Sequence, residues 1–347
     1  MDCVEIASFE VTHRALVWPW VAIDPTRTRF AFATTERSIA TRAFASGRVS
    51  EGTTFALPAD LALPTEKAPD LGHRGSERGV HGFAIDPCGE LLAVTGTIDG
   101  ASVVVTLDAN GEVRRTRVDA LAGPDFVAHA VTFDRTGARL WLSAESGRET
   151  ALISIDARTH ALAGVVRSAP FPATAYHELY VHAQDDAVLL LAACGQDGTF
   201  ARVAGWSDGP PVAIETALDQ GAVSAGFVGF SSDGARVHLA EADELRTHAW
   251  PGLETLSSVP LADEFVSSYS GAVIDSLIFV DGEIDRDDAP QDAVMMFDRS
   301  ALKGALVSPP APPGMWVGKL GANAIVTVEA KGDPARGRVL LVRKIAN

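Results

Sequence analysis

Three histidines recur in the sequence at one constant spacing. His81, His129 and His177 each lie at the start of a short apolar segment, and each follows the one before by 48 residues. Imidazole nitrogens are common ligands of divalent metals, so three that converged would form an open catalytic-type site, with Zn, Fe or Mn as the candidate ions. Glu178 directly follows His177 and is the candidate general base or fourth ligand.

The constant spacing also has a structural explanation. It repeats because the surrounding segment repeats, and a histidine at the start of a strand can simply hydrogen-bond a neighbouring turn. Both interpretations stay open at the level of the sequence.

The segment around each histidine belongs to an internal repeat of about 40–50 residues. His81–Val94 aligns with His129–Leu142, and a third copy begins at His177. More divergent copies begin near Trp20, Gly226, Ser270 and Met315.

Every copy has the same predicted elements. An alternating apolar strand leads to a turn of the Asp-Pro-x-Gly type, because Pro fixes φ and Gly accepts positive φ. A second apolar strand follows. A third then ends in Asp, as in Val103–Asp108, Leu152–Asp156 and Val294–Asp298.

Seven such copies predict an all-β fold. We expect a single domain over residues 1–347: a seven-bladed β-propeller with four antiparallel strands in each blade. The last copy has no outer strand of its own. The strand-like segment 4–11 is therefore predicted to complete the last blade and close the ring, since open sheet edges favour aggregation.

The repeats resemble those of seven-bladed propellers of the YVTN and lactonase-like type. The best matches are His81–Val94 and His129–Leu142, and the resemblance extends over nearly the whole chain. It implies the fold more strongly than a function, because such repeats occur in non-enzymes, lactonases, lyases and sensors.

Two further sets of residues are candidates for ligand binding. A long loop over residues 58–80 leads directly into His81, and it either covers the same end of the blades or is a plain surface loop. Aromatic residues near the starts of inner strands either line a funnel for a ligand or pack between blades. The candidate ligand-binding residues are His73, Arg74, Arg78, Trp18, Tyr176, Tyr269 and Trp316.

Composition restricts the partners and the compartment. The chain has 29 Lys and Arg against 45 Asp and Glu, and its formal net charge of −16 disfavours nucleic acid. It has no apolar run of the ~20 residues that a membrane helix needs, so no membrane association is expected. The N-terminus lacks a secretory signal and the three cysteines form no motif, which predicts a cytoplasmic protein unless a leader was removed.

These observations favour a binding scaffold that presents a site for a protein segment or a small molecule at the mouth of the central channel. The alternative is a metal-dependent, lactonase-like hydrolase or lyase that uses the three histidines and Glu178.

Overall fold

The computed structural model describes most of the 347-residue chain. The described residues are 2–11, 20–63, 79–172, 176–194, 198–205, 212–214, 225–241, 244–261, 265–286, 289–298, 304–306, 314–329 and 334–343. For strand residues 2, 212–214, 265–269, 285–286, 289–292, 304–306 and 343, the backbone alone is described.

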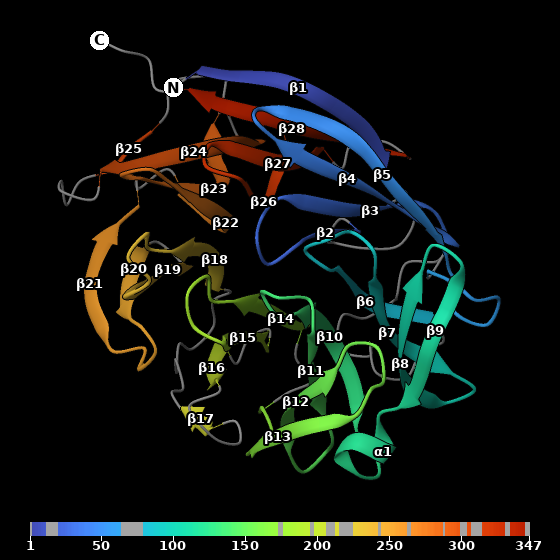
Figure 1. Cartoon of the computed structure of the whole chain (residues 1–347). Helices are drawn as coiled ribbons and strands as arrows, with labels where there is room; N and C mark the ends of the chain where they lie inside the picture. The colour runs from blue at the N-terminus through green and yellow to red at the C-terminus, as the bar shows by residue number, and fades with distance from the viewer. Residues whose placement is uncertain are drawn as a thin grey trace. The chain divides into compact units, whose positions relative to one another are not determined.

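Internal contacts divide the chain into two compact units. Unit 1 comprises Met1–Val11, Phe44–Val49 and Ala222–Asn347, and unit 2 comprises Thr12–Ala43 and Ser50–Gly221. The strands form seven separate four-stranded antiparallel sheets, which are the blades of a seven-bladed β-propeller (Figure 1). The predicted fold class is confirmed, whereas the prediction of a single domain stays a prediction.

The first four blades follow one another along the chain from β2 to β17. Blade 1 has β2 (Val21–Ile23), β3 (Arg29–Thr35), β4 (Ser38–Ala45) and β5 (Arg48–Ala56); blade 2 has β6 (Gly79–Ile85), β7 (Leu92–Ile98), β8 (Ala101–Asp108) and β9 (Gly111–Arg117); blade 3 has β10 (Val127–Phe133), β11 (Arg139–Glu145), β12 (Thr150–Asp156) and β13 (Leu162–Ser168); blade 4 has β14 (Tyr176–Val181), β15 (Ala187–Ala193), β16 (Thr199–Gly205) and β17 (Val212–Ile214).

The remaining three blades lie in unit 1. Blade 5 has β18 (Ala225–Phe230), β19 (Arg236–Glu241), β20 (Glu244–Ala249) and β21 (Thr255–Pro260); blade 6 has β22 (Phe265–Ile274), β23 (Leu277–Arg286), β24 (Ala289–Asp298) and β25 (Gly304–Leu306); blade 7 has β26 (Met315–Leu320), β27 (Ala324–Glu329), β28 (Ala335–Arg343) and β1 (Asp2–Val11).

The N-terminal strand completes the last blade, as the sequence predicted. β1 pairs antiparallel with β28 from Asp2 opposite Arg343 to Val11 opposite Ala335. An ion pair of 3.0 Å between Glu5 and Arg336 crosses the same pair of strands. The two ends of the chain are therefore joined in one sheet, and β28 has a partner along its outer edge.

An aspartate at the end of the innermost strand organises the first turn in several blades. The carboxylate of Asp86 accepts the backbone N–H groups of Glu90 and Leu91 at 2.8 and 2.9 Å. Asp24 and Asp134 accept the N–H groups of Arg29 and Arg139 in the corresponding turns. The Asp-Pro-x-Gly pattern thus encodes a turn whose N–H groups are satisfied by a side chain.

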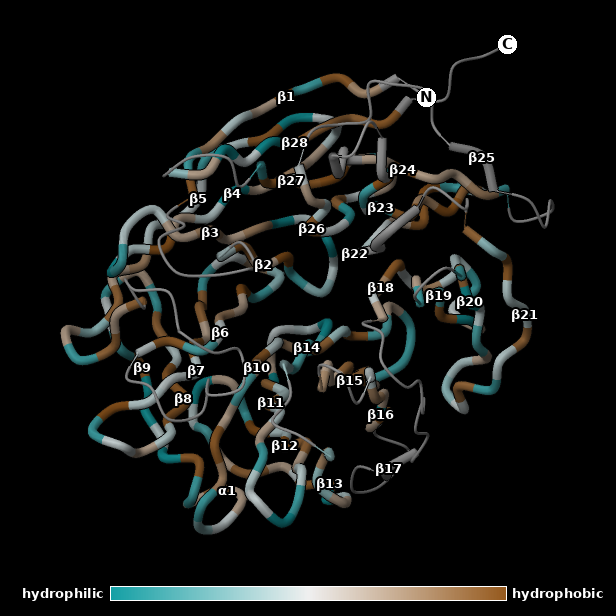
Figure 2. The backbone as a smooth tube through the Cα atoms, turned by 180° about the vertical axis from the view of Figure 1, so that it is seen from behind, coloured by the Kyte–Doolittle hydropathy of each residue, from teal (hydrophilic) through white to brown (hydrophobic). Residues whose placement is uncertain are grey.

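The cores consist of apolar strand residues stacked from one blade to the next. In unit 2, Phe133, Leu140 and Leu142 of blade 3 share one buried cluster with Ala93 and Val104 of blade 2. Hydrophobic residues follow the strands, while the turns are largely hydrophilic (Figure 2). In the described part of the chain the single helix is α1 (Asp119–Ala122), and no helix there is long and apolar enough to cross a membrane.

The aspartate turn gives a direct test of this architecture. Asp86→Ala is expected to lower the free energy of unfolding by about 1–3 kcal/mol, because a buried and a partly buried N–H group lose their acceptor. Asp86→Asn keeps one acceptor oxygen and is expected to cost less than half as much. Urea denaturation of both variants measures the difference, and equal losses would show that the two hydrogen bonds do not account for the effect.

Candidate functional site

Two of the three histidines occupy the same special position in their blades. In blade 2, Val80 pairs with Gly96 and Gly82 pairs with Thr95, so His81 is an extra residue without a cross-strand partner. In blade 3, His129 is the extra residue in the same way, between Ala128 and Ala130. Each histidine is therefore the bulged residue of its innermost strand, and a β-bulge re-aims the side chain at that point.

His177 lies in a different register although its spacing is the same. β14 pairs with β15 without a bulge, and His177 is opposite Ala192. The residue opposite the corresponding Ala144 in blade 3 is Ala128, so His177 takes the structural place of Ala128. The expectation that all three histidines are equivalent is wrong for His177, because the blade 4 strand lacks the extra residue.

The His81 ring connects blade 2 to blade 3. Its Nδ1 donates to the backbone carbonyl of Ala128 at 2.8 Å, since a carbonyl can only accept. Its Nε2 is 3.2 Å from the Thr97 hydroxyl. Both ring nitrogens of His81 are thus used in structural hydrogen bonds.

His129 and His177 do come together, and the third group beside them is Glu145. Glu145 Oε2 lies 3.8 Å from His129 Nε2 and 3.6 Å from His177 Nε2. The two imidazole rings are 4.5 Å apart between centroids and tilted by 41°. We refer to His129, Glu145 and His177 as the His–Glu cluster.

The members of the His–Glu cluster differ in their access to solvent. The His177 side chain is fully buried, whereas 7% of the His129 side chain and 12% of the Glu145 side chain are exposed. His129 and Glu145 therefore form the outer part of the cluster and His177 its inner wall.

The His177 ring is fixed by its surroundings in unit 2. Its Nδ1 is 3.1 Å from the Ser143 hydroxyl, and Phe171 meets the ring edge-on at 5.3 Å. The Arg202 guanidinium lies 4.1 Å above the Phe171 ring and donates to the Ala169 carbonyl. Burial, followed by the positive charge of Arg202, lowers the pKa of His177 to about 3, so the ring is neutral at neutral pH.

Glu178 is not the carboxylate beside His177. Consecutive strand residues point to opposite faces, so Glu178 lies on the other face of β14 from His177. Its carboxylate accepts a hydrogen bond of 2.8 Å from the Tyr180 hydroxyl, which lies two residues along on the same face. Burial and this carboxylate raise the pKa of Tyr180, and Glu145 takes the place that the sequence assigned to Glu178.

The structure brings together two of the three histidines that the sequence assigned to a metal. Among the residues that the structure describes, no group of three or more His, Cys, Asp or Glu side chains is arranged to hold a metal ion. The two ring nitrogens of His81 contact the Ala128 carbonyl and the Thr97 hydroxyl. The metal hypothesis for His81, His129 and His177 stays a prediction.

The predicted ligand-binding residues are placed as follows. Tyr176 is the first residue of β14 and is half-buried. Trp316 of β26 is 1% exposed and packs against Phe279 at 5.9 Å, within the core of unit 1. Tyr269 belongs to β22, but its side chain lies outside the description, as do Trp18, His73, Arg74, Arg78 and most of the predicted loop 58–80.

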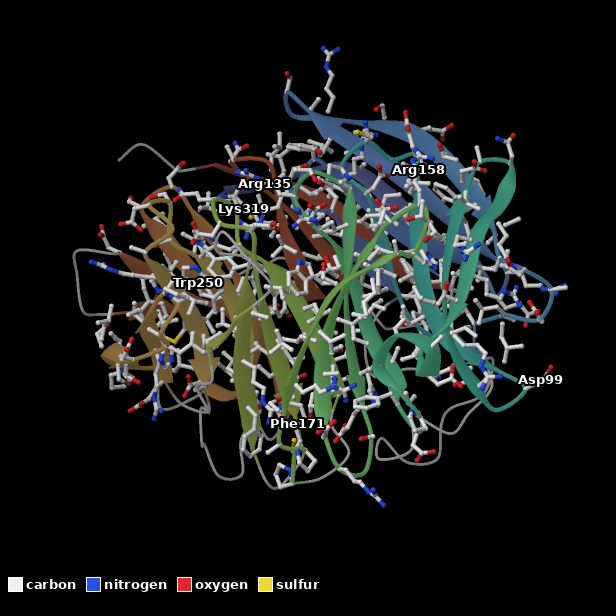
Figure 3. All side chains as sticks on the ribbon, turned by 60° about the horizontal axis from the view of Figure 1, so that its bottom comes forward. Asp99, Arg135, Arg158, Phe171, Trp250 and Lys319 are labelled. Atoms are coloured by element: carbon white, nitrogen blue, oxygen red, sulfur yellow. The ribbon has the colours of Figure 1, made fainter. Side chains whose placement is uncertain are left out.

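The His–Glu cluster and the aspartate turns lie at opposite ends of the unit 2 strands. Figure 3 shows Asp99 and Phe171 at one end, and Arg135 and Arg158 at the other. The His–Glu cluster lies at the Phe171 end, because Phe171 contacts His177 directly. The aspartate turns lie at the Arg135 end, because Arg135 follows Asp134.

Sequence reasoning missed Glu145, although a signal for it was available. It ends the second strand of blade 3, where the positions 48 residues before and after it hold Thr97 and Ala193. A carboxylate at a position that is small or neutral in the neighbouring copies is the feature that points to it.

Comparisons with known proteins support the fold and do not assign a family. No family model and no curated protein matches the sequence. Among solved structures, the chain is similar to the β-propeller domain of Cps50 (Swd1) from Myceliophteria thermophila, with a TM-score of 0.57 and 10% identity over 97% of this chain and 100% of that one. The comparison shows a propeller and does not single out the YVTN and lactonase-like type. Since 1075 solved chains match, the architecture by itself says little about function.

The buried His177 predicts a specific dependence of stability on pH. Its pKa falls from 6.5 to about 3 on folding, so the unfolded chain binds more protons between these values. Stability is therefore fully present above pH 6.5 and falls as the pH drops towards 3, by about 1.4 kcal/mol per pH unit for this one group.

In the variant His177→Gln, the slope of the unfolding free energy against pH between pH 6 and 4 is expected to be smaller by about the contribution of one proton. His160, whose pKa is also lowered by burial, to about 4, contributes in the same direction and remains in both proteins. Urea denaturation across this pH range gives the two slopes. Equal slopes for the parent chain and His177→Gln would show that the pKa of His177 is not lowered by folding.

Proposed function

We propose that this chain is a binding scaffold that holds its ligand at the His–Glu cluster in unit 2. The observation that carries the proposal is the convergence of His129, Glu145 and His177 from two neighbouring blades around one carboxylate oxygen. Propellers commonly serve as rigid frames of this kind, with loops and strand ends that present a site.

The support around the cluster is typical of a preorganised site. His129 projects from a bulge, and bulges are frequent beside functional sites. The His177 ring is held by contacts with Ser143 and Phe171, and Arg202 packs on the Phe171 ring. Such a fixed inner wall reduces the entropy lost when a ligand binds to the outer groups, His129 and Glu145.

The charge of the cluster favours a basic or neutral ligand group. The cluster contains one carboxyl group, that of Glu145, and His177 contributes no positive charge at neutral pH. The chain as a whole carries a formal charge of −16. A lysine or arginine side chain of a protein segment, or the ammonium group of a small molecule, has the complementary charge.

The enzyme alternative has less support from the geometry. It requires three imidazoles around one metal and Glu178 as the base. His81 instead binds Ala128 and Thr97, and Glu178 lies on the opposite face of β14 from His177. The proposal therefore rests on binding rather than on metal-dependent chemistry.

A peptide library displayed on phage and selected on the full chain tests the proposal. Enriched peptides are expected to carry Lys or Arg. Glu145→Gln is expected to weaken the dissociation constant of a synthetic enriched peptide by about tenfold or more, since a buried charged hydrogen bond is lost. His129→Ala is expected to weaken the same peptide in the same direction.

Glu149→Gln is the matched control for Glu145→Gln. It removes the same charge four residues along the chain, from a half-exposed side chain that pairs with Arg167 at 2.6 Å. Binding by this variant is expected to stay within about twofold of the parent chain, because exposed pairs contribute little. Peptides that bind Glu145→Gln as tightly as the parent chain, or a selection without enrichment, would count against the site.

A further inference from the structure

The first turn of blade 1 departs from the other copies of the same turn. In blades 2, 3 and 5 the fourth turn residue is Gly89, Gly137 or Gly234, with φ of 76°, 76° and 70°. In blade 1 the residue at that position is Arg27, with φ of 60°. Its backbone N–H donates to the Asp24 carbonyl at 2.9 Å, as the glycines do to their own aspartate or serine.

An arginine at this position has a conformational cost. The left-handed region is open to glycine but brings the Cβ of other residues close to the following carbonyl. The chain itself uses glycine at three equivalent turns, so the turn does not require an arginine for its geometry. A residue held in an unfavourable conformation is a reason to look for a role of its side chain.

The Arg27 side chain is partly buried and reaches solvent. It is half-buried by exposed area, and burial, opposed only by the charge of Asp24, lowers the pKa of its guanidinium. Within the described residues the guanidinium has no hydrogen bond or ion pair. The nearby Asp24 carboxylate is engaged instead by the backbone N–H groups of Thr26, Thr28 and Arg29, at 2.8, 2.7 and 2.5 Å.

We propose that Arg27 is a second binding site, which takes a carboxylate group of a ligand. The guanidinium is planar and can direct two of its five N–H donors to the two oxygens of a carboxylate. A desolvated arginine without a partner gains from an anion that supplies both charge and acceptors.

A singly charged carboxylate fits this environment better than a phosphate. One guanidinium balances one negative charge, whereas a phosphate near neutral pH carries more. The excess charge would lie beside Asp24, whose pKa is already raised by burial, in a chain with a formal charge of −16.

This site is separate from the His–Glu cluster. Arg27 follows the end of β2, in the turn equivalent to that of Gly137, and so belongs with the aspartate turns at the Arg135 end of the strands in Figure 3. The His–Glu cluster lies at the Phe171 end of unit 2. The proposal therefore stands on its own observation, and Glu145→Gln is expected to leave it unchanged.

The variant Arg27→Gly, which restores the residue of the other turns, separates a binding role from a structural one. Relief of the left-handed conformation is expected to lower the unfolding equilibrium constant by about three- to fivefold. Asp99→Gly is the matched control, because Asp99 also has a positive φ, of 48°, in a turn at the other end of unit 2. It too should gain stability, without any effect on anion binding.

Binding is measured with acetate as the probe, against sodium chloride at the same ionic strength. In proton–nitrogen NMR spectra, the Arg27 Nε–H resonance and the Thr26 and Thr28 amides are expected to shift saturably with acetate. The two amides should not respond in Arg27→Gly and should respond normally in Asp99→Gly.

Three results would overturn the proposal. An Arg27→Gly variant less stable than the parent chain would show that the arginine supports the fold. The absence of a saturable acetate response in the parent chain would remove the site. Saturation by inorganic phosphate at lower concentration than by acetate would contradict the assignment to a carboxylate.

Discussion

The pairing register between the innermost strand and the second strand controls which side chains meet in each blade. Where an extra residue enters the innermost strand, as at His81 and His129, every residue before it is displaced by one position relative to its partner strand. Val228 and Val317 are the extra residues in blades 5 and 7. β14 has none, and that single difference brings His177 to the wall of blade 3 in the place of an alanine.

The hydrogen bonds around Ala128 explain how the bulge is held in position. The backbone N–H of Ala128 donates to the Ser102 hydroxyl at 2.9 Å, and its carbonyl accepts from His81 at 2.8 Å. Both partners belong to blade 2, so the residue directly before His129 is fixed from the neighbouring blade. His81 is thus a positioning residue for His129, so the two histidines differ in role although they are equally spaced in the repeat.

The sequence predicted those features that depend on local pattern. The alternating strands, the Asp-Pro-x-Gly turns, the third strands that end at Asp108 and Asp156, and the completion of blade 7 by the N-terminal strand all follow from periodicity and turn chemistry. The convergence of the site did not follow, because it depends on one inserted residue. The register of β14 and the proximity of Glu145 to His177 emerge only from the strand pairing.

Departures of the chain from its own repeat are more informative than the repeat itself. The repeated residues, such as Asp86 and Gly137, satisfy turns and would serve any propeller. Glu145 in place of a threonine or alanine puts a carboxylate at the edge of the core, and Arg27 in place of glycine forces an unfavourable backbone. The neighbouring blades 2 and 4 have Thr97 and Ala193 in place of Glu145, and blades 2, 3 and 5 have glycine in place of Arg27. Real proteins depart from local rules mainly at functional or strained sites, which is why these two departures are the positions at which we propose binding.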